Sequence, residues 1–149
     1  MRQVEEDMLI AIKERKYMKK QNTIVTTLDV DSENYRINVQ LHGHLIAQIF
    51  PRGNSDIRKP FLYISHCGYV TRTTTSRLNE IIRACTLSRG CFMSYDSLMV
   101  YLPPNSVRDL MWDHHMKYGP EPLAYVQQAL IEMSDSSNAF LHLPLRDNF

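Results

Sequence analysis

Histidines are the residues of this sequence best suited to chemistry, and four of them fall in two pairs. His42 and His44 flank a glycine, and His114 and His115 are adjacent. A zinc site needs three or four ligands that converge from fixed positions, whereas neighbouring residues of a helix diverge by about 100°. We therefore expect no metal site and interpret the histidines as packed or hydrogen-bonded rings.

Recognisable catalytic motifs are absent from the sequence. His42 and His44 lack the threonine of the paired HxT phosphoesterases, and no HExxH, GxSxG, GxxxxGK[ST] or GxGxxG occurs. Asp113, His114 and His115 can still polarise a water between them. We therefore predict no catalytic residue and no cofactor, and we keep a small hydrolase that uses His114 and His115 as an alternative.

Charge is distributed unevenly along the chain, although the formal net charge is only +1. Residues 52–89 carry seven Lys or Arg against two Asp or Glu, whereas residues 90–149 carry three against seven. This asymmetry can form a basic face for an anionic partner, or it can let two parts of one molecule attract each other. Nucleic acid is therefore the alternative partner, with predicted contacts at Arg52, Arg58, Lys59, Arg72, Arg77 and Arg83.

The length and composition indicate one folded unit. A chain of 149 residues, with 44% hydrophobic and 22% charged residues, can bury one hydrophobic core. Cys67, Cys85 and Cys91 match neither a disulfide framework nor a CxxC metal motif, so we expect reduced thiols. The N-terminus does not resemble a secretory signal, and no segment has the ~18 apolar residues of a membrane span. We expect a cytoplasmic protein.

Hydrophobic periodicity places the elements of the first half. An amphipathic pattern with early acids and late lysines is typical of a helix, and apolar residues in strict alternation are typical of half-buried strands. His42-Gly43 lies between two such runs and predicts a hairpin turn. The predicted elements are a helix over 2–20, strands over 23–28, 35–41 and 44–50, a loop over 51–56 and a strand over 61–65.

The second half begins with a return to helical spacing. Threonines and serines that can cap a helix precede an apolar stripe, and Gly90 is well placed to end that helix. The predicted elements are a helix over 75–87, a hairpin over 91–103 that turns at Asp96-Ser97, helices over 106–118 and 120–133, and an apolar tail over 139–149. We expect the tail to dock, either on the core of its own chain or on a neighbouring subunit. A homo-oligomer is therefore one of the alternatives.

Together these elements predict an α+β fold. A small antiparallel sheet packs with an N-terminal helix and a central helix, and a hairpin and two C-terminal helices follow. Residues 1–90 are the predicted α+β core, and residues 91–149 are a hairpin and helical extension packed on the same core. Aromatic residues of the extension suit either a core or a protein interface. The interface candidates are Trp112, His115, Tyr118, Phe140 and Phe149.

Two segments carry a resemblance to a known family. VQLHGHLIAQI and GYVTRTTTSRLNEII resemble small tailed-phage proteins of uncharacterised function, and the resemblance covers about residues 4–85. The family pattern usually has Asn at the position of His44, which argues against an HxH ligand pair. The matching positions are His42, Gly43, Ala47, Gly68, Thr71, Thr73, Thr74, Arg77, Leu78 and Asn79.

The resemblance implies a role without bringing a known activity. Phages encode many short accessory proteins that bind a host protein or nucleic acid, and such a protein needs a surface rather than chemistry. The favoured hypothesis is therefore a non-enzymatic accessory protein in the host cytoplasm. It would bind a host or phage protein, as an inhibitor of a host defence or another host process. Residues 91–149 lie beyond the resemblance and are where we expect any specialised activity.

Overall fold

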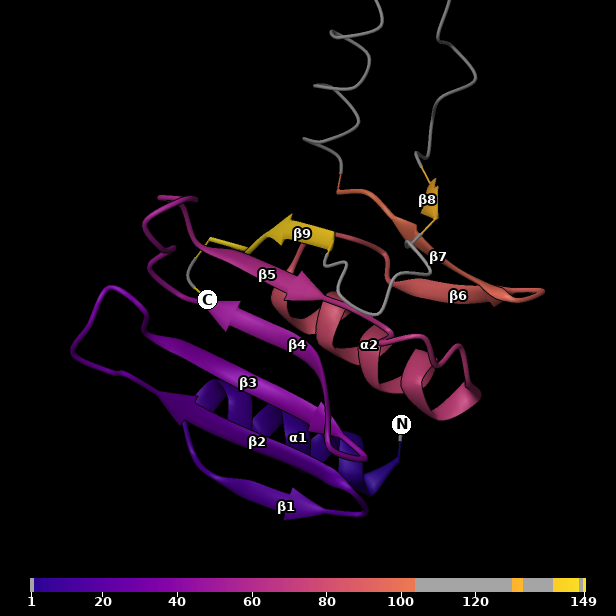
Figure 1. Cartoon of the computed structure of the whole chain (residues 1–149), viewed down its shortest axis with the longest axis horizontal. Coiled ribbons are helices and arrows are strands. Elements are labelled where there is room, and N and C mark those ends of the chain that lie inside the picture. The colour runs from indigo at the N-terminus through magenta and orange to yellow at the C-terminus, as the bar shows by residue number, and fades with distance from the viewer. Residues whose placement is uncertain (1, 104–129, 133–140, 148) are drawn as a thin grey trace, which may run out of the picture.

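The part of the chain that the structure describes is an α+β fold, in which two helices lie behind a large antiparallel sheet (Figure 1). The structure, a computed structural model, describes residues 2–103, 130–132, 141–147 and 149. Among these residues the helices are α1 (Gln3–Glu14) and α2 (Arg72–Cys85). The large sheet has the order β1 (Met18–Lys20), β2 (Thr23–Leu28), β3 (Arg36–Leu41), β4 (His44–Phe50), β5 (Phe61–Ile64) and β9 (Leu141–Pro144). A three-stranded sheet consists of β6 (Cys91–Ser94), β7 (Ser97–Tyr101) and β8 (Leu130–Glu132).

One continuous core joins the two sheets and the helices. Alternate residues of the large sheet face the helices, which contribute the apolar stripes predicted from their spacing. Cys91, Leu98 and Val100 of the small sheet and Leu143 of β9 belong to the same cluster. The other buried members include Met8, Ala11, Ile12, Val25, Ile37, Val39, Ala47, Ile49, Leu62, Ile64, Leu78, Ile81 and Ile82. Residues from both predicted parts of the chain therefore share one core.

The predicted hairpin at His42-Gly43 is confirmed. Both residues have positive φ, 51° and 79°, and Leu41 pairs directly with His44. A two-residue turn with two left-handed residues matches the twist of the strands that it joins, which explains the short connection. The strands at 23–28 and 44–50 coincide with the predicted ones, because alternating burial is a local property of the sequence.

The first helix is shorter than predicted. It ends at Glu14 because Arg15 takes a left-handed conformation, with φ 59°. The chain then turns into β1, so Lys19 and Lys20 lie on a strand rather than at a helix end. Lys20 instead donates from Nζ to Asp7 of α1 at 2.7 Å.

The central helix is confirmed, with different ends. It begins at Arg72 after the N-cap Thr71 and ends at Cys85, because Thr86 is extended. The prediction that Gly90 ends this helix is wrong. Gly90 lies further along the chain at φ 115°, where a Cβ atom would clash with Oδ1 of Asn79. Its positive φ and this close approach, and not a helix cap, therefore favour glycine at position 90.

The second hairpin turns one residue earlier than predicted, because Ser94 pairs with Ser97 and leaves Tyr95 and Asp96 in the turn. Of the two predicted C-terminal helices, 106–118 lies outside the described residues. The prediction for 120–133 is wrong at its end, because Leu130–Glu132 forms β8 and pairs with β7. Strand pairing with a distant segment here overrides the local apolar pattern.

The C-terminal tail docks on the chain's own core. β9 pairs with β5 in antiparallel register, from Phe61↔Pro144 to Ile64↔Leu141, and Leu143 is buried. Of the two predicted alternatives, the tail therefore docks on its own chain and not on a neighbouring subunit. Within the described residues, neither helix has the length and apolar character needed to cross a membrane.

A buried ion pair joins α1, α2 and β2. Arg77 Nη1 lies 3.0 Å from Glu5 Oε2, and both side chains are only 2% exposed. Arg77 also donates from Nε to Thr23 Oγ1 at 3.1 Å, and Ser76 Oγ donates to Glu5 Oε2 at 2.5 Å. The charges are therefore paired and hydrogen-bonded, as burial requires.

We predict that Glu5→Gln lowers the free energy of unfolding by about 3 kcal/mol, because removal of one partner leaves the Arg77 charge buried and unpaired. Urea denaturation at neutral pH measures the loss. The matched control is Glu6→Gln on the exposed face of the same helix, which should change stability little. An equal effect of the two substitutions would contradict the prediction.

The same pair predicts a pH dependence. Burial raises the pKa of Glu5, but hydrogen bonds from Ser76, the Arg2 backbone and Arg77 lower it, and the pKa lies below its ordinary value of 4.5. A group whose pKa is lowered on folding stabilises the fold above its unfolded pKa, and that stability is lost as pH falls through the folded pKa. The difference in free energy of unfolding between wild type and Glu5→Gln should therefore be largest above pH 4.5 and should decrease as the pH falls below that value.

Candidate functional site

The β3–β4 turn and the start of α2 come together around one cavity. These are the two segments on which the family resemblance rests, and they are separated in the sequence by a loop and β5. The cavity has a volume of about 320 Å³. We call it the histidine–threonine cavity, and its lining is Leu41, His42, His44, Ile46, His66, Tyr69, Thr71, Thr73 and Thr74.

A tight turn before α2 orients His66 in the cavity wall. Cys67 and Gly68 both have positive φ, 56° and 83°, and this bend brings the Gly68 N–H to His66 Nδ1 at 2.9 Å. A nitrogen that accepts a hydrogen bond carries no proton, so this geometry places the ring proton on Nε2. His66 is buried, and the backbone holds its ring orientation.

An aromatic pair forms the rim of the cavity. The rings of His44 and Tyr69 lie 4.6 Å apart at 33°, and Tyr69 is 51% exposed. Leu41 and Ile46 are buried and supply apolar lining. The cavity thus combines an exposed aromatic rim with apolar walls and a few polar groups, which is typical of binding pockets.

Thr71 links the cavity to the helix. Its Oγ1 accepts a hydrogen bond from the Thr74 N–H at 3.1 Å and donates one to Thr74 Oγ1 at 3.0 Å. Thr75 Oγ1 also donates to the Thr71 carbonyl at 2.7 Å. The threonine cluster predicted to cap the helix does so, and the same cap shapes the cavity wall.

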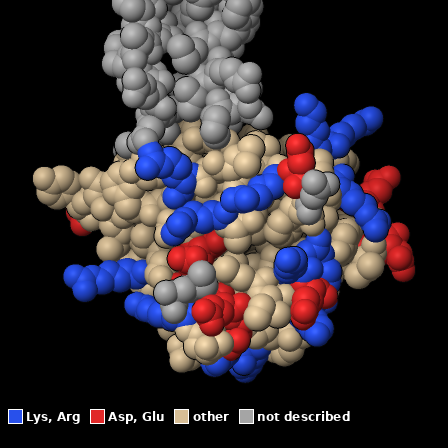
Figure 2. All heavy atoms as spheres, turned by 180° about the vertical axis from the view of Figure 1, so that it is seen from behind, with Lys and Arg blue, Asp and Glu red and all other residues tan. Residues whose placement is uncertain are grey.

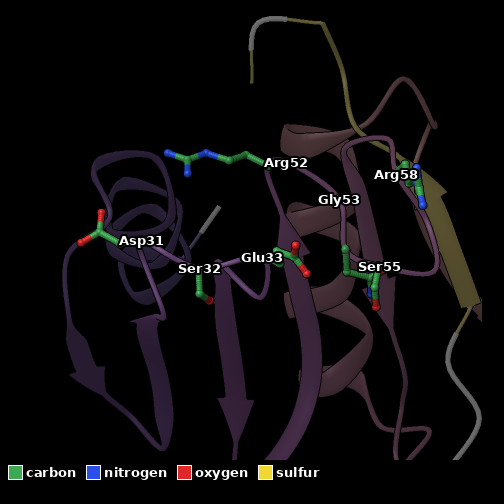
Figure 3. Close-up of a pocket in the computed structure, with 8 residues that line it drawn as sticks. Asp31, Ser32, Glu33, Arg52, Gly53, Ser55 and Arg58 are labelled. Atoms are coloured by element: carbon green, nitrogen blue, oxygen red, sulfur yellow. The ribbon is translucent and has the colours of Figure 1, made fainter.

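A second hollow lies between the β2–β3 and β4–β5 loops (Figure 3). Its volume is about 630 Å³, and its lining is Asp31, Ser32, Glu33, Arg52, Gly53, Asn54, Ser55 and Arg58. In Figure 3, Arg52 and Arg58 lie on opposite sides, with Glu33 between them. Since two acidic and two basic side chains share this hollow, its lining is balanced in charge and does not specifically favour an anion.

Of the six predicted nucleic-acid contacts, one is not available to a partner. Arg77 is buried in its ion pair. Arg72 and Arg83 are eleven positions, or about three turns, apart on α2, so they project from the same side of the helix about 16 Å apart. Arg52, Arg58 and Lys59 are exposed on the loop after β4. On the helix face, Lys and Arg side chains are interspersed with Asp and Glu (Figure 2).

Of the predicted interface residues, the structure describes only Phe149. Its ring lies beneath the Arg15 guanidinium at 5.3 Å, and its backbone carbonyl accepts a hydrogen bond from Arg15 Nη2 at 3.4 Å. Phe149 is partly buried against the core. Trp112, His115, Tyr118 and Phe140 lie outside the described residues, as does His114.

The cysteines of this chain are free thiols, as predicted. Burial raises the pKa of both Cys85 and Cys91 to about 12, so neither is a thiolate at neutral pH. Cys67 is partly buried and lies within hydrogen-bonding distance of the Leu45 carbonyl, with Sγ 3.0 Å from the oxygen. Among the residues that the structure describes, no three His, Cys, Asp or Glu side chains are grouped as ligands of one metal ion.

A family model described as Kyanoviridae Gp96 protein matches residues 1–116. The chain belongs to this family. The Gp96 family consists of phage proteins, so the phage resemblance inferred from the two segments is confirmed. No curated protein and no solved structure matches the chain. The matched range includes every residue that lines the histidine–threonine cavity.

We predict that Thr71→Ala lowers the free energy of unfolding by about 1 kcal/mol, because the helix loses its N-cap hydrogen bond. Chemical denaturation measures the loss. Thr73→Ala is the matched control, since Thr73 lies in the same turn without capping the helix. The account of the cap is contradicted if Thr73→Ala costs as much as Thr71→Ala.

Proposed function

We propose that this member of the Gp96 family is a non-enzymatic phage accessory protein that binds a host or phage protein through the histidine–threonine cavity. We further propose that it acts as an inhibitor of a host defence or another host process. One observation supports the proposal: the β3–β4 turn and the start of α2, the two segments that carry the family resemblance, line the same cavity. A partner side chain would insert there between the aromatic rim and the apolar wall.

The make-up of the cavity supports a protein partner. Protein interfaces are anchored by a few side chains that fill pockets, with aromatic residues enriched around them. Leu41 and Ile46 offer apolar contact, and His44 and Tyr69 offer ring surface at the entrance. An apolar or aromatic side chain of the partner suits this lining best.

The positions of the basic residues favour a protein partner over nucleic acid. Nucleic-acid binding relies on several cations that follow one phosphate backbone. Here Arg77 is buried in its ion pair, and on the helix face Lys and Arg side chains are interspersed with Asp and Glu (Figure 2). The hydrolase alternative rests on His114 and His115, which lie outside the described residues.

We predict that Tyr69→Ala abolishes capture of the partner, because the rim loses its exposed ring. The measurement is an affinity pull-down from phage-infected host lysate with wild type and variant side by side, read by mass spectrometry. Tyr17→Ala is the matched control, because Tyr17 is 66% exposed and is not part of the cavity lining. It should capture the same partner as wild type.

Two results would contradict the proposal. One is equal capture by wild type, Tyr69→Ala and Tyr17→Ala, which would place the binding surface elsewhere. The other is a lysate that yields no specific partner, together with a hydrolytic activity of the purified protein. Circular dichroism of the variants shows that each is folded before the comparison is read.

A further inference from the structure

We propose that two copies of this chain pair through the face of the large sheet that is turned away from the helices. Figure 1 looks onto this face, with α1 and α2 behind the strands. Strand register defines its central row, because directly paired residues share a face: Thr26 pairs with Asn38, and Asn38 pairs with Gln48. We call it the open face, and its central residues are Ile24, Thr26, Asn38, Gln40, Leu45, Gln48 and Tyr63. All seven are partly exposed, whereas Phe50 and Phe61, which pair with each other at one end of the same face, are buried.

The centre of the open face is uncharged. None of its seven central residues is Asp, Glu, Lys or Arg, in a chain of which 22% is charged. Charged side chains on this face lie at its margin. Lys19 is on the edge strand opposite Ile24, and Arg36 is at the end of β3, where its Nη1 lies 2.7 Å from Asp29 Oδ2. Loss of charge at the centre with charge kept at the rim is the compositional mark of a protein interface.

A second copy is the occupant that fits this chemistry. In a twofold dimer the same surface meets itself, so a charge at its centre would face a like charge. A neutral face avoids that repulsion. Side-chain amides carry both donors and acceptors, so Asn38, Gln40 and Gln48 can each bond to amides of the second copy. Within one copy, Gln48 Nε2 already donates to Asn38 Oδ1 at 3.2 Å, which holds these two amides in a fixed orientation.

The edges of the sheet offer a poorer route to self-association than its face. β1 is short and carries two lysines, and β9 ends at Pro144, which cannot donate to a neighbouring strand. The six strands have between 3 and 7 residues and lie about 4.8 Å apart, so at about 3.3 Å per residue the face covers about 500 Å² in projection. This is of the order of the ~800 Å² per partner in a standard interface.

The test is sedimentation velocity of the full chain over a concentration series. Wild type should sediment as a species of twice the 17.4 kDa chain mass. Gln48→Lys should be monomeric, because the substitution places two like charges in the interface. Ile10→Lys is the control, since Ile10 is 53% exposed on α1 and away from the open face. It should remain dimeric.

A charge-swap mixture distinguishes a lost interface from a lost fold. Gln48→Lys and Gln48→Glu should each be monomeric and should form a heterodimer when mixed. If either variant fails to fold by circular dichroism, Thr26→Lys and Thr26→Glu on the same row replace the pair. A wild type that stays monomeric at every concentration overturns the proposal, as does a folded Gln48→Lys that stays dimeric. This test is independent of the histidine–threonine cavity, because none of its substitutions alters the cavity lining.

Discussion

The buried ion pair between Glu5 and Arg77 is the constraint on which the arrangement of the helices depends. Two charges placed in an apolar interior are unfavourable unless they meet each other and further hydrogen-bond partners. Ser76 and Thr23 supply those partners, so α1, α2 and β2 must approach in one geometry. A purely apolar contact between the helices would allow them to slide, whereas this network fixes their register.

The same network positions the cavity. Arg77 follows the first turn of α2, and Thr71, Thr73 and Thr74 at that turn line the cavity. Arg77 also donates to Thr23 of β2, which pairs directly with the lining residue Leu41. Leu41 precedes the His42-Gly43 turn, and the His42 N–H donates to the Asn22 carbonyl at 2.9 Å. The ion pair thus connects β2, whose neighbour Leu41 lines the cavity, to the helix whose first turn also lines it. Binding at the cavity would rest on this support.

The sequence predicted the elements that depend on local patterns and missed those that depend on distant contacts. Alternating burial made the strands at 23–28 and 44–50 predictable, and the threonines at 71–75 indicated that a helix begins nearby, although it begins at Arg72 and not at 75. β8 and the end of α1 were not predictable in this way, since one depends on a pairing with β7 and the other on a left-handed Arg15. The tail's apolar residues indicated docking, but only the fold shows that it docks on β5.

The candidate site was only partly visible in the sequence. His42 and His44 drew attention as a pair, but His66 and Tyr69 did not, because nothing local shows that residues 42–46 and 66–74 meet. One clue to the ion pair was present. Glu5 lies between the apolar residues of the first helix, and Arg77 directly precedes Leu78 on the second. A charged residue on a buried stripe predicts a buried partner.

A double-mutant cycle between Glu5 and Arg77 tests this account most directly. The free energy of unfolding is measured by denaturation for wild type, Glu5→Gln, Arg77→Gln and the double variant. The account predicts strong coupling, of about 2–3 kcal/mol, so that the double variant is much less destabilised than the sum of the single ones. Additivity within about 0.5 kcal/mol would show that the pair does not hold the helices in place and would contradict the account.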